Sequence, residues 1–166
     1  FITYTGEVKE SYPTQIEATK IQTEKEYYTK IEELPQNYSV EQAIKDNCIV
    51  GIHNMKIYNK DELDRFVENV NNNIPDFIRT INFSDEGDML INDIDFEGSN
   101  SFRVCLDWTR DRYSSSENRT YKYLRYTKMR IDQKDGETRI YLEDPIEGDV
   151  NTAYVIGYNE NTEIIN

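Results

Sequence analysis

The sequence has few of the residues from which most catalytic and metal centres are built. It contains one histidine, His53, and two cysteines, Cys48 and Cys105, which form neither a zinc-binding spacing nor a redox motif. His53 is the only side chain whose ordinary pKa lies near neutrality, and no nucleophile motif accompanies it. We therefore expect His53 to be a hydrogen-bonded loop residue and the protein to be non-catalytic. The cysteines are either two buried thiols or one disulfide, a choice that geometry decides.

Basic residues and long apolar runs are also scarce. Lys and Arg number 19 against 32 Asp and Glu, which gives a net charge of −13 at pH 7. Such a field repels phosphate backbones and anionic lipid headgroups, so we expect neither nucleic acid nor a bare membrane surface as a partner. No apolar run is long enough to span a bilayer. The chain opens on Phe1 in place of Met, which indicates a processed or truncated chain, so the absence of a signal peptide is uninformative.

The length of 166 residues suits one domain with flanking segments. Residues 1–36 are rich in Thr, Glu, Lys and Gln and predict an N-terminal arm or linker, with a short edge strand over 1–8 and a weak helix over 24–34. We expect residues 37–160 to form a single α+β domain and residues 161–166 to form a polar C-terminal tail.

The clearest element is an amphipathic helix over residues 59–70. Its apolar residues follow the spacing i, i+3, i+4 and i+7, which places them along one face; they are Leu63, Phe66, Val67 and Val70. Asn59 is expected to cap the first turn through its side chain, with Glu62 completing a capping box. This helix requires an apolar surface to cover.

A second helix is predicted over residues 38–47, directly before a strand. Ser39 and Gln42 have the spacing of a capping box, and Asn47 suits a left-handed stop. The apolar run over 48–52 that follows predicts a strand buried on both faces.

From Asp76 onward the hydrophobic period changes to two. This pattern predicts six strands, over residues 77–83, 90–96, 102–108, 121–131, 140–142 and 153–158. Asp135-Gly136 is a strong hairpin signal between the fourth and fifth of them. Short connections favour an antiparallel β-meander, so we expect a two-layer α+β fold with helices packed on one face of the sheet.

One strand concentrates positive charge and supplies the candidate binding site. Alternate residues of the 121–131 strand place basic and aromatic groups on one face, and a neighbouring strand adds Arg103. The candidates are Arg103, Lys122, Tyr126, Lys128 and Arg130. This surface could bind an anion or a protein partner, with Tyr126 as a flat contact. The alternative is pairing of these cations with acids on adjacent strands, such as Asp107, Glu137 and Glu143. Trp108 and Tyr123 are expected in the core.

Acidic turns are the only candidate metal ligands. Asp85, Glu86 and Asp88 could hold a weakly bound calcium ion, because flexible turns supply oxygen ligands readily. The second candidate turn contains Glu143, Asp144, Glu147 and Asp149. The alternative in both places is a solvated turn, and no other cofactor is expected.

The order of elements resembles a known bacterial family. The stretch from Tyr38 to Lys45, reading YSVEQAIK, is followed by the strand at 50–53 and the helix at 63–71. Together they resemble a domain family of unknown function found in secreted lipoproteins of Bacillus- and Clostridium-type bacteria. The resemblance covers residues 38–158 as an order of elements and carries no catalytic or binding residues. It implies a lipid-anchored or secreted domain outside the membrane, with residues 1–36 as the spacer after an anchor that this chain lacks.

These observations lead us to expect an extracytoplasmic binding or interaction module with a protein or cell-envelope partner. Two rival hypotheses remain open. A carboxylate-based hydrolase acting on cell-wall material would need two acids facing each other in a cleft. A calcium-dependent module would use the acidic turns. The sequence specifies neither the ligand nor the oligomeric state.

Overall fold

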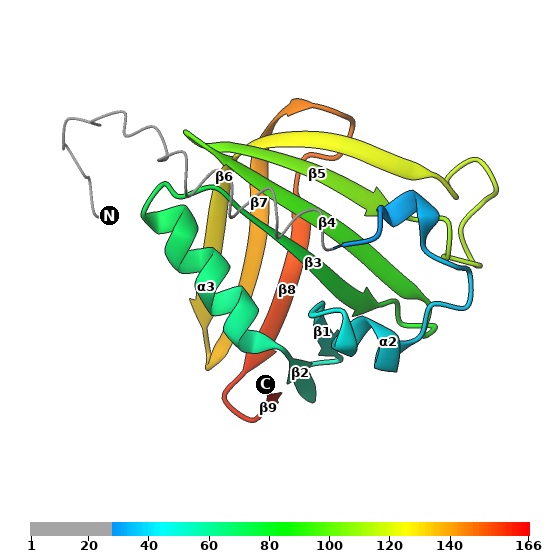
Figure 1. Cartoon of the computed structure of the whole chain (residues 1–166), viewed down its shortest axis with the longest axis horizontal. Helices are drawn as coiled ribbons and strands as arrows, with labels where there is room; N and C mark the ends of the chain where they lie inside the picture. The colour runs from blue at the N-terminus through cyan, green and yellow to red at the C-terminus, as the bar shows by residue number, and fades with distance from the viewer. Residues whose placement is uncertain (1–27) are drawn as a thin grey trace.

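The computed structural model describes residues 28–166, in which one large sheet carries two α-helices and a short 3-10 turn (Figure 1). The elements in chain order are η1 (Ile31–Glu33), α2 (Val40–Lys45), β1 (Ile49–Ile52), β2 (Lys56–Tyr58), α3 (Lys60–Asn71), β3 (Asp76–Phe83), β4 (Met89–Gly98), β5 (Ser101–Asp107), β6 (Tyr121–Lys134), β7 (Glu137–Glu147), β8 (Ala153–Asn159) and β9 (Glu163–Ile165). The expectation of an α+β domain is confirmed.

The sheet is mixed and curled, not a purely antiparallel meander. Its nine strands have the order β8-β7-β6-β5-β4-β3-β1-β2-β9. Strands β3 to β8 form an antiparallel meander, but β1 pairs in parallel with β3, and β2 pairs in parallel with β9. The sheet curls until β8 lies against β3 and β4, where Asn82 and Asn92 donate side-chain hydrogen bonds to the carbonyls of Val155 and Tyr154. The result is a half-barrel (Figure 1).

Helical segments pack on both faces of the sheet, whereas the sequence predicted two layers with helices on one face only. Inside the curl, α3 joins the larger core through Leu63 and Phe66, which belong to the same cluster as buried residues on the inner faces of β3 to β8. On the outer face, η1 and α2 cover a second core that contains Ile31, Leu34 and Ala43 together with Ile81 and Ile91 of the sheet. The helical segments therefore lie on opposite faces.

The strand β1 shows why two cores are needed. Its Ile49 belongs to the inner core and its neighbour Val50 to the outer core, and both are fully buried. The prediction of a strand buried on both faces is therefore confirmed. The six predicted later strands are also present, and Asp135 and Gly136 form the β6–β7 hairpin with left-handed φ angles of 53° and 76°.

The segment before α2 packs on the outer face. Of the helix expected over 24–34, the described part is the short turn η1, and the strand expected over 1–8 lies outside the described residues. Arg79, 1% exposed, donates to the Thr29 carbonyl at 2.8 Å and pairs with Asp93 at 2.6 Å. Arg110 donates to the Leu34, Pro35 and Gln36 carbonyls, which fixes the same segment further along.

Two short strands were not predicted, and one core assignment, that of Tyr123, was wrong. Strand β9 lies in the expected polar tail, and β2 lies between β1 and α3. Tyr123 is 62% exposed and donates its hydroxyl to Glu32 at 2.6 Å, whereas core burial was expected. Trp108 is only partly buried at the edge of the inner core. The exposed position of Tyr123 follows from its strand face, which it shares with Arg103 and Cys105 outside the curl.

Candidate functional site

A groove lies between α3 and the strands opposite it in the described part of the molecule. It has a volume of about 450 Å³ and opens to solvent, a size typical of ligand sites. One wall is α3, and the other is formed by β6, β7 and β8. The lining residues are Leu63, Asp64, Val67, Glu68, Asn71, Asn72, Ile131, Gln133, Thr138, Ile140 and Tyr158. We call this feature the α3 groove.

The α3 groove has an apolar floor and an acidic rim. Leu63 and Ile140 are buried in the floor, while Ile131 at its edge is 40% exposed. Asp64 and Glu68 stand on the rim one helical turn apart, and no basic residue occurs among the described residues that line the groove. Lys60 lies beside it, where it donates to Asp64 at 2.7 Å and stacks over the Tyr158 ring at 4.9 Å.

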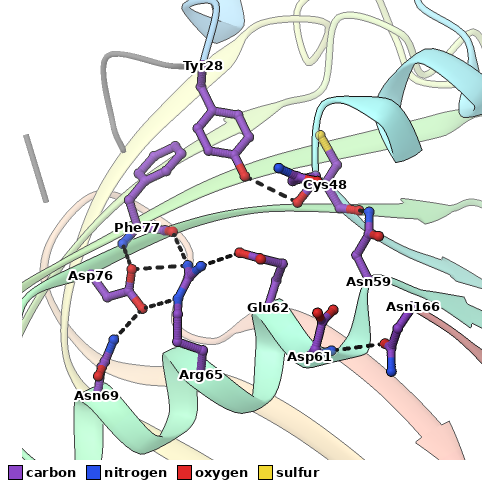
Figure 2. Close-up of polar contacts among 11 residues, drawn as sticks. Tyr28, Cys48, Asn59, Asp61, Glu62, Arg65, Asn69, Asp76, Phe77 and Asn166 are labelled. Carbon is purple, nitrogen blue, oxygen red and sulfur yellow. Dashed lines mark hydrogen bonds and ion pairs between the residues drawn. The ribbon is translucent and has the colours of Figure 1, made fainter. Parts of the chain in front are cut away.

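The far side of α3 is fixed to the sheet by a polar network, shown in Figure 2. Arg65 donates to both carboxylate oxygens of Asp76 at 3.1 and 3.2 Å, and it also pairs with Glu62. Asn69 donates to Asp76 at 2.8 Å. Because Asp76 is 1% exposed, these bonds satisfy a buried carboxylate and hold the helix at a fixed angle. Because these bonds are made on the far side of α3, they do not occupy the side that faces the groove.

The N-terminus of α3 is held differently from the predicted capping box. Asn59 has a left-handed φ of 54° and makes no side-chain cap, so that prediction is wrong. Its amide instead donates to the Ile44 and Cys48 carbonyls at 3.0 and 2.9 Å, which ties α3 to α2 and β1. The side chain of Asn166 accepts from the Asp61 amide at 3.2 Å and takes the capping role (Figure 2). In α2, by contrast, Ser39 caps as predicted by accepting from the Gln42 amide.

The residues predicted to form one basic surface are divided between the two faces of the sheet. Lys122 pairs with Asp149 at 2.8 Å, and Arg103 pairs with Glu97 on the outer face. Tyr126 cannot be the expected flat contact, because it is fully buried and donates its hydroxyl to the Val150 carbonyl. Burial raises the pKa of Tyr126 to about 12.

Lys128 and Arg130 both bond to Glu143 at 2.8 Å, which is the ion pairing that the sequence offered as the alternative. Met129 and Ile131, which alternate with Lys128 and Arg130 along β6, point toward the inner core and the α3 groove. Lys128 and Arg130 therefore lie on the other face of β6, opposite to that of Tyr126. The alternation of faces therefore changes phase after Tyr126. Across from this point, Asp144 of β7 has a left-handed φ of 57° and its carbonyl accepts from Thr127.

The acidic turn at 84–88 uses its one buried carboxylate within the protein. Asp88 accepts from the Arg112 amide at 2.9 Å and from its guanidinium at 2.7 Å, and these bonds hold the pKa of Asp88 below its usual range. Asp85 and Glu86 are exposed. Among residues 28–166 no three His, Cys, Asp or Glu side chains are grouped to hold a metal ion. The calcium site stays a prediction.

The remaining reactive groups are spread over the molecule. His53 is exposed, with a φ of 44° in the turn after β1, and its ring lies 6.3 Å from that of Phe83. Cys48 and Cys105 are both free thiols, so the disulfide alternative is wrong; Cys48 is buried as expected, and Cys105 is partly buried. Burial raises the pKa of Cys48 to about 11 and that of Cys105 to about 12.

The apolar residues that line the α3 groove belong to patterns visible in the sequence, but no single segment indicates that these residues meet. Ile131 and Ile140 are directly opposed across the β6–β7 hairpin, and Val67 is in the apolar stripe of α3. Each pattern predicted its own element. Only the curl of the sheet brings the hairpin toward the helix, and nothing in either segment specifies that curl.

The fold and the groove define a small α+β domain with a curled sheet and one open surface beside its longest helix. A family model described as a domain of unknown function (DUF4362) matches residues 45–141, which is more than half of the chain. The chain belongs to this family, so the expected membership in a family of unknown function is confirmed. No curated protein and no solved structure matches the chain. Within the described residues, no helix is long and apolar enough to cross a membrane.

Proposed function

We propose that this protein is a non-catalytic binding module located outside the cytoplasm. It would itself be part of a secreted or lipid-anchored protein of the cell envelope. The observation that carries the binding role is the α3 groove, because an apolar floor with a polar rim is what ligand sites in proteins have in common. Its extracytoplasmic placement rests on the resemblance of the helix-strand-helix opening to domains of secreted lipoproteins.

Binding is favoured over hydrolysis by the placement of the groove carboxylates. Asp64 and Glu68 project from successive turns of the same helix, and Asp64 is already bonded to Lys60. A glycoside hydrolase requires two carboxyl groups that flank the scissile bond from opposite sides. The wall facing these acids contributes Gln133, Thr138 and Tyr158, which are suited to hydrogen bonding with a ligand.

Site-specific photo-crosslinking in cells tests the binding role. A photoreactive side chain at Gln133, on the groove wall, is expected to capture a defined partner. The same group at Asn37, an exposed residue before α2 on the outer face, is the matched control and is expected to capture none. Equal capture from both positions, or none from Gln133, would overturn the assignment of the groove.

Protease accessibility tests the location independently. In intact cells stripped of their wall, added protease is expected to degrade the protein while a cytoplasmic marker survives. Protection of the protein until the membrane is lysed would place it inside the cell and refute the extracytoplasmic assignment.

A further inference from the structure

We propose that the α3 groove accepts a basic polypeptide segment, which sets an apolar side chain on the floor and a Lys or Arg against the rim. This inference rests on the proposed binding function and specifies the class of partner. It is carried by two features of the groove, its shape and its charge.

The floor selects for an apolar side chain. Leu63, Val67, Ile131 and Ile140 converge from α3 and the β6–β7 hairpin, and Ile131 remains 40% exposed. A side chain placed here would cover this apolar surface and remove it from water, a gain of roughly 25 cal/mol for each Å² buried. A soluble polyamine would match the charge of the rim but would leave the floor uncovered.

The rim selects for positive charge from two sources. Glu68 has no ion-pair partner among residues 28–166, since Lys60 pairs with Asp64 instead. The last turn of α3 contains no basic residue, so no cationic side chain within that turn offsets the partial negative charge of the helix C-terminus beside Asn71 and Asn72. A cation that approaches this end meets both the carboxylate and the helix dipole.

The charge of the whole chain decides among the macromolecules that could fit. The net charge of −13 repels nucleic acids and anionic membranes. A second copy of this chain would bring an equally acidic surface to the acidic rim. A basic partner is instead attracted at long range and steered to the groove.

A fluorescence-anisotropy titration of the full chain tests the inference with a short labelled peptide of leucine and lysine. We expect this peptide to bind, with affinity falling as salt is raised. A peptide of serine and lysine should bind at least about tenfold more weakly, because it cannot cover the floor. A peptide of leucine and glutamate should not bind.

Two groove variants and one control make the test specific. Glu68→Gln is expected to weaken binding of the leucine-lysine peptide by about fivefold to tenfold, as for a charge at an interface rim. Ile131→Ser should weaken it similarly through the floor. Glu41→Gln removes the same charge from exposed α2 on the outer face and should leave the affinity unchanged.

Three results would overturn the inference: no binding, equal binding of the leucine-glutamate peptide, or equal weakening by Glu68→Gln and Glu41→Gln. The last of these would mean that the peptide responds only to net charge. The proposed function is tested separately, by the capture of partners at Gln133. If Gln133 captures an acidic or neutral partner in cells, the groove is a binding site but the basic class is wrong.

Discussion

At the scale of single residues, Gly148 has the closest approach of any glycine within residues 28–166. It has a φ of +99°, and a Cβ added there would lie 2.1 Å from Cδ2 of Leu124. Leu124 is 3% exposed and belongs to the inner core, so it has little room to move. The loop after β7 is therefore pressed directly onto the core, and only glycine permits this approach.

The substitution Gly148→Ala tests this contact. We expect it to lower the free energy of unfolding by about 3–4 kcal/mol, the sum of left-handed backbone strain and an overpacked core. Gly87→Ala is the matched control, because Gly87 has a φ of +86° but nothing within 4 Å of an added Cβ. It should lose only the backbone share of about 1–2 kcal/mol. Urea unfolding of both variants measures the difference, and equal losses would show that the core absorbs the methyl group.

At the scale of elements, α3 is held from three directions. Its N-terminus is tied to α2 and β1 by Asn59, its far side to β3 by Arg65, and its first turn to the end of the chain by Asn166. In most surface helices a single buried stripe has this role. The extra polar ties let α3 keep its position while the side that faces the groove makes fewer contacts.

Substitution of Asn59 separates its two contributions. Asn59→Gly keeps the left-handed backbone but removes both hydrogen bonds, and we expect it to cost about 1–3 kcal/mol of stability because two carbonyls lose their donor. Asn59→Ala should cost about 1 kcal/mol more through backbone strain. Asn47→Gly is the control: Asn47 also has a left-handed φ of 59°, but its exposed side chain makes no hydrogen bond within the described residues. Thermal or urea unfolding would contradict this account if all three variants were equally stable.

How far the elements could be predicted depended on their length. The 12 residues of α3 show their stripe over three turns, and the alternation in β5 persists for seven residues, so both were recognised. The strands β2 and β9 have three residues each, too few for a period to be distinguished from chance. Their pairing is parallel and joins residues 56–58 to 163–165, so it is decided by the assembled sheet and not by local sequence. The division of the predicted basic residues between two faces has a similar cause, since the expected strict alternation is interrupted where β6 changes phase.

At the scale of the whole molecule, some of the acids are paired with basic residues on neighbouring strands and loops. Hydrogen bonds from Lys128 and Arg130 hold the pKa of Glu143 below its usual range, and a hydrogen bond from Lys122 does the same for Asp149. A carboxyl group with a lowered pKa in the folded state stabilises that state above its unfolded-state pKa. The contribution is lost as the pH falls through the folded-state pKa.

Glu143→Gln tests this linkage. The variant is expected to be less stable than the wild type at pH 7. The difference should shrink as the pH falls below about 4, because the Glu143 carboxylate is then protonated and, like the glutamine, neutral. Urea unfolding at a series of pH values measures it, with Glu41→Gln as a control for the general effect of removing one charge. A stability difference that stayed constant down to pH 2 would rule out the ionised pair as its cause.

The curl of the sheet also bears on how this protein avoids self-association into fibrils. Exposed strand edges are templates on which further chains add, and a long open sheet normally has two of them. Here one edge strand, β8, is turned against its own sheet, where Asn82 and Asn92 occupy the carbonyls of Val155 and Tyr154. The other described edge is β9, which is three residues long and begins with an acid, Glu163. An incoming strand would thus find two carbonyls of one edge already bonded and only three residues of strand at the other, so the curl of the sheet reduces the edge on which further chains could add.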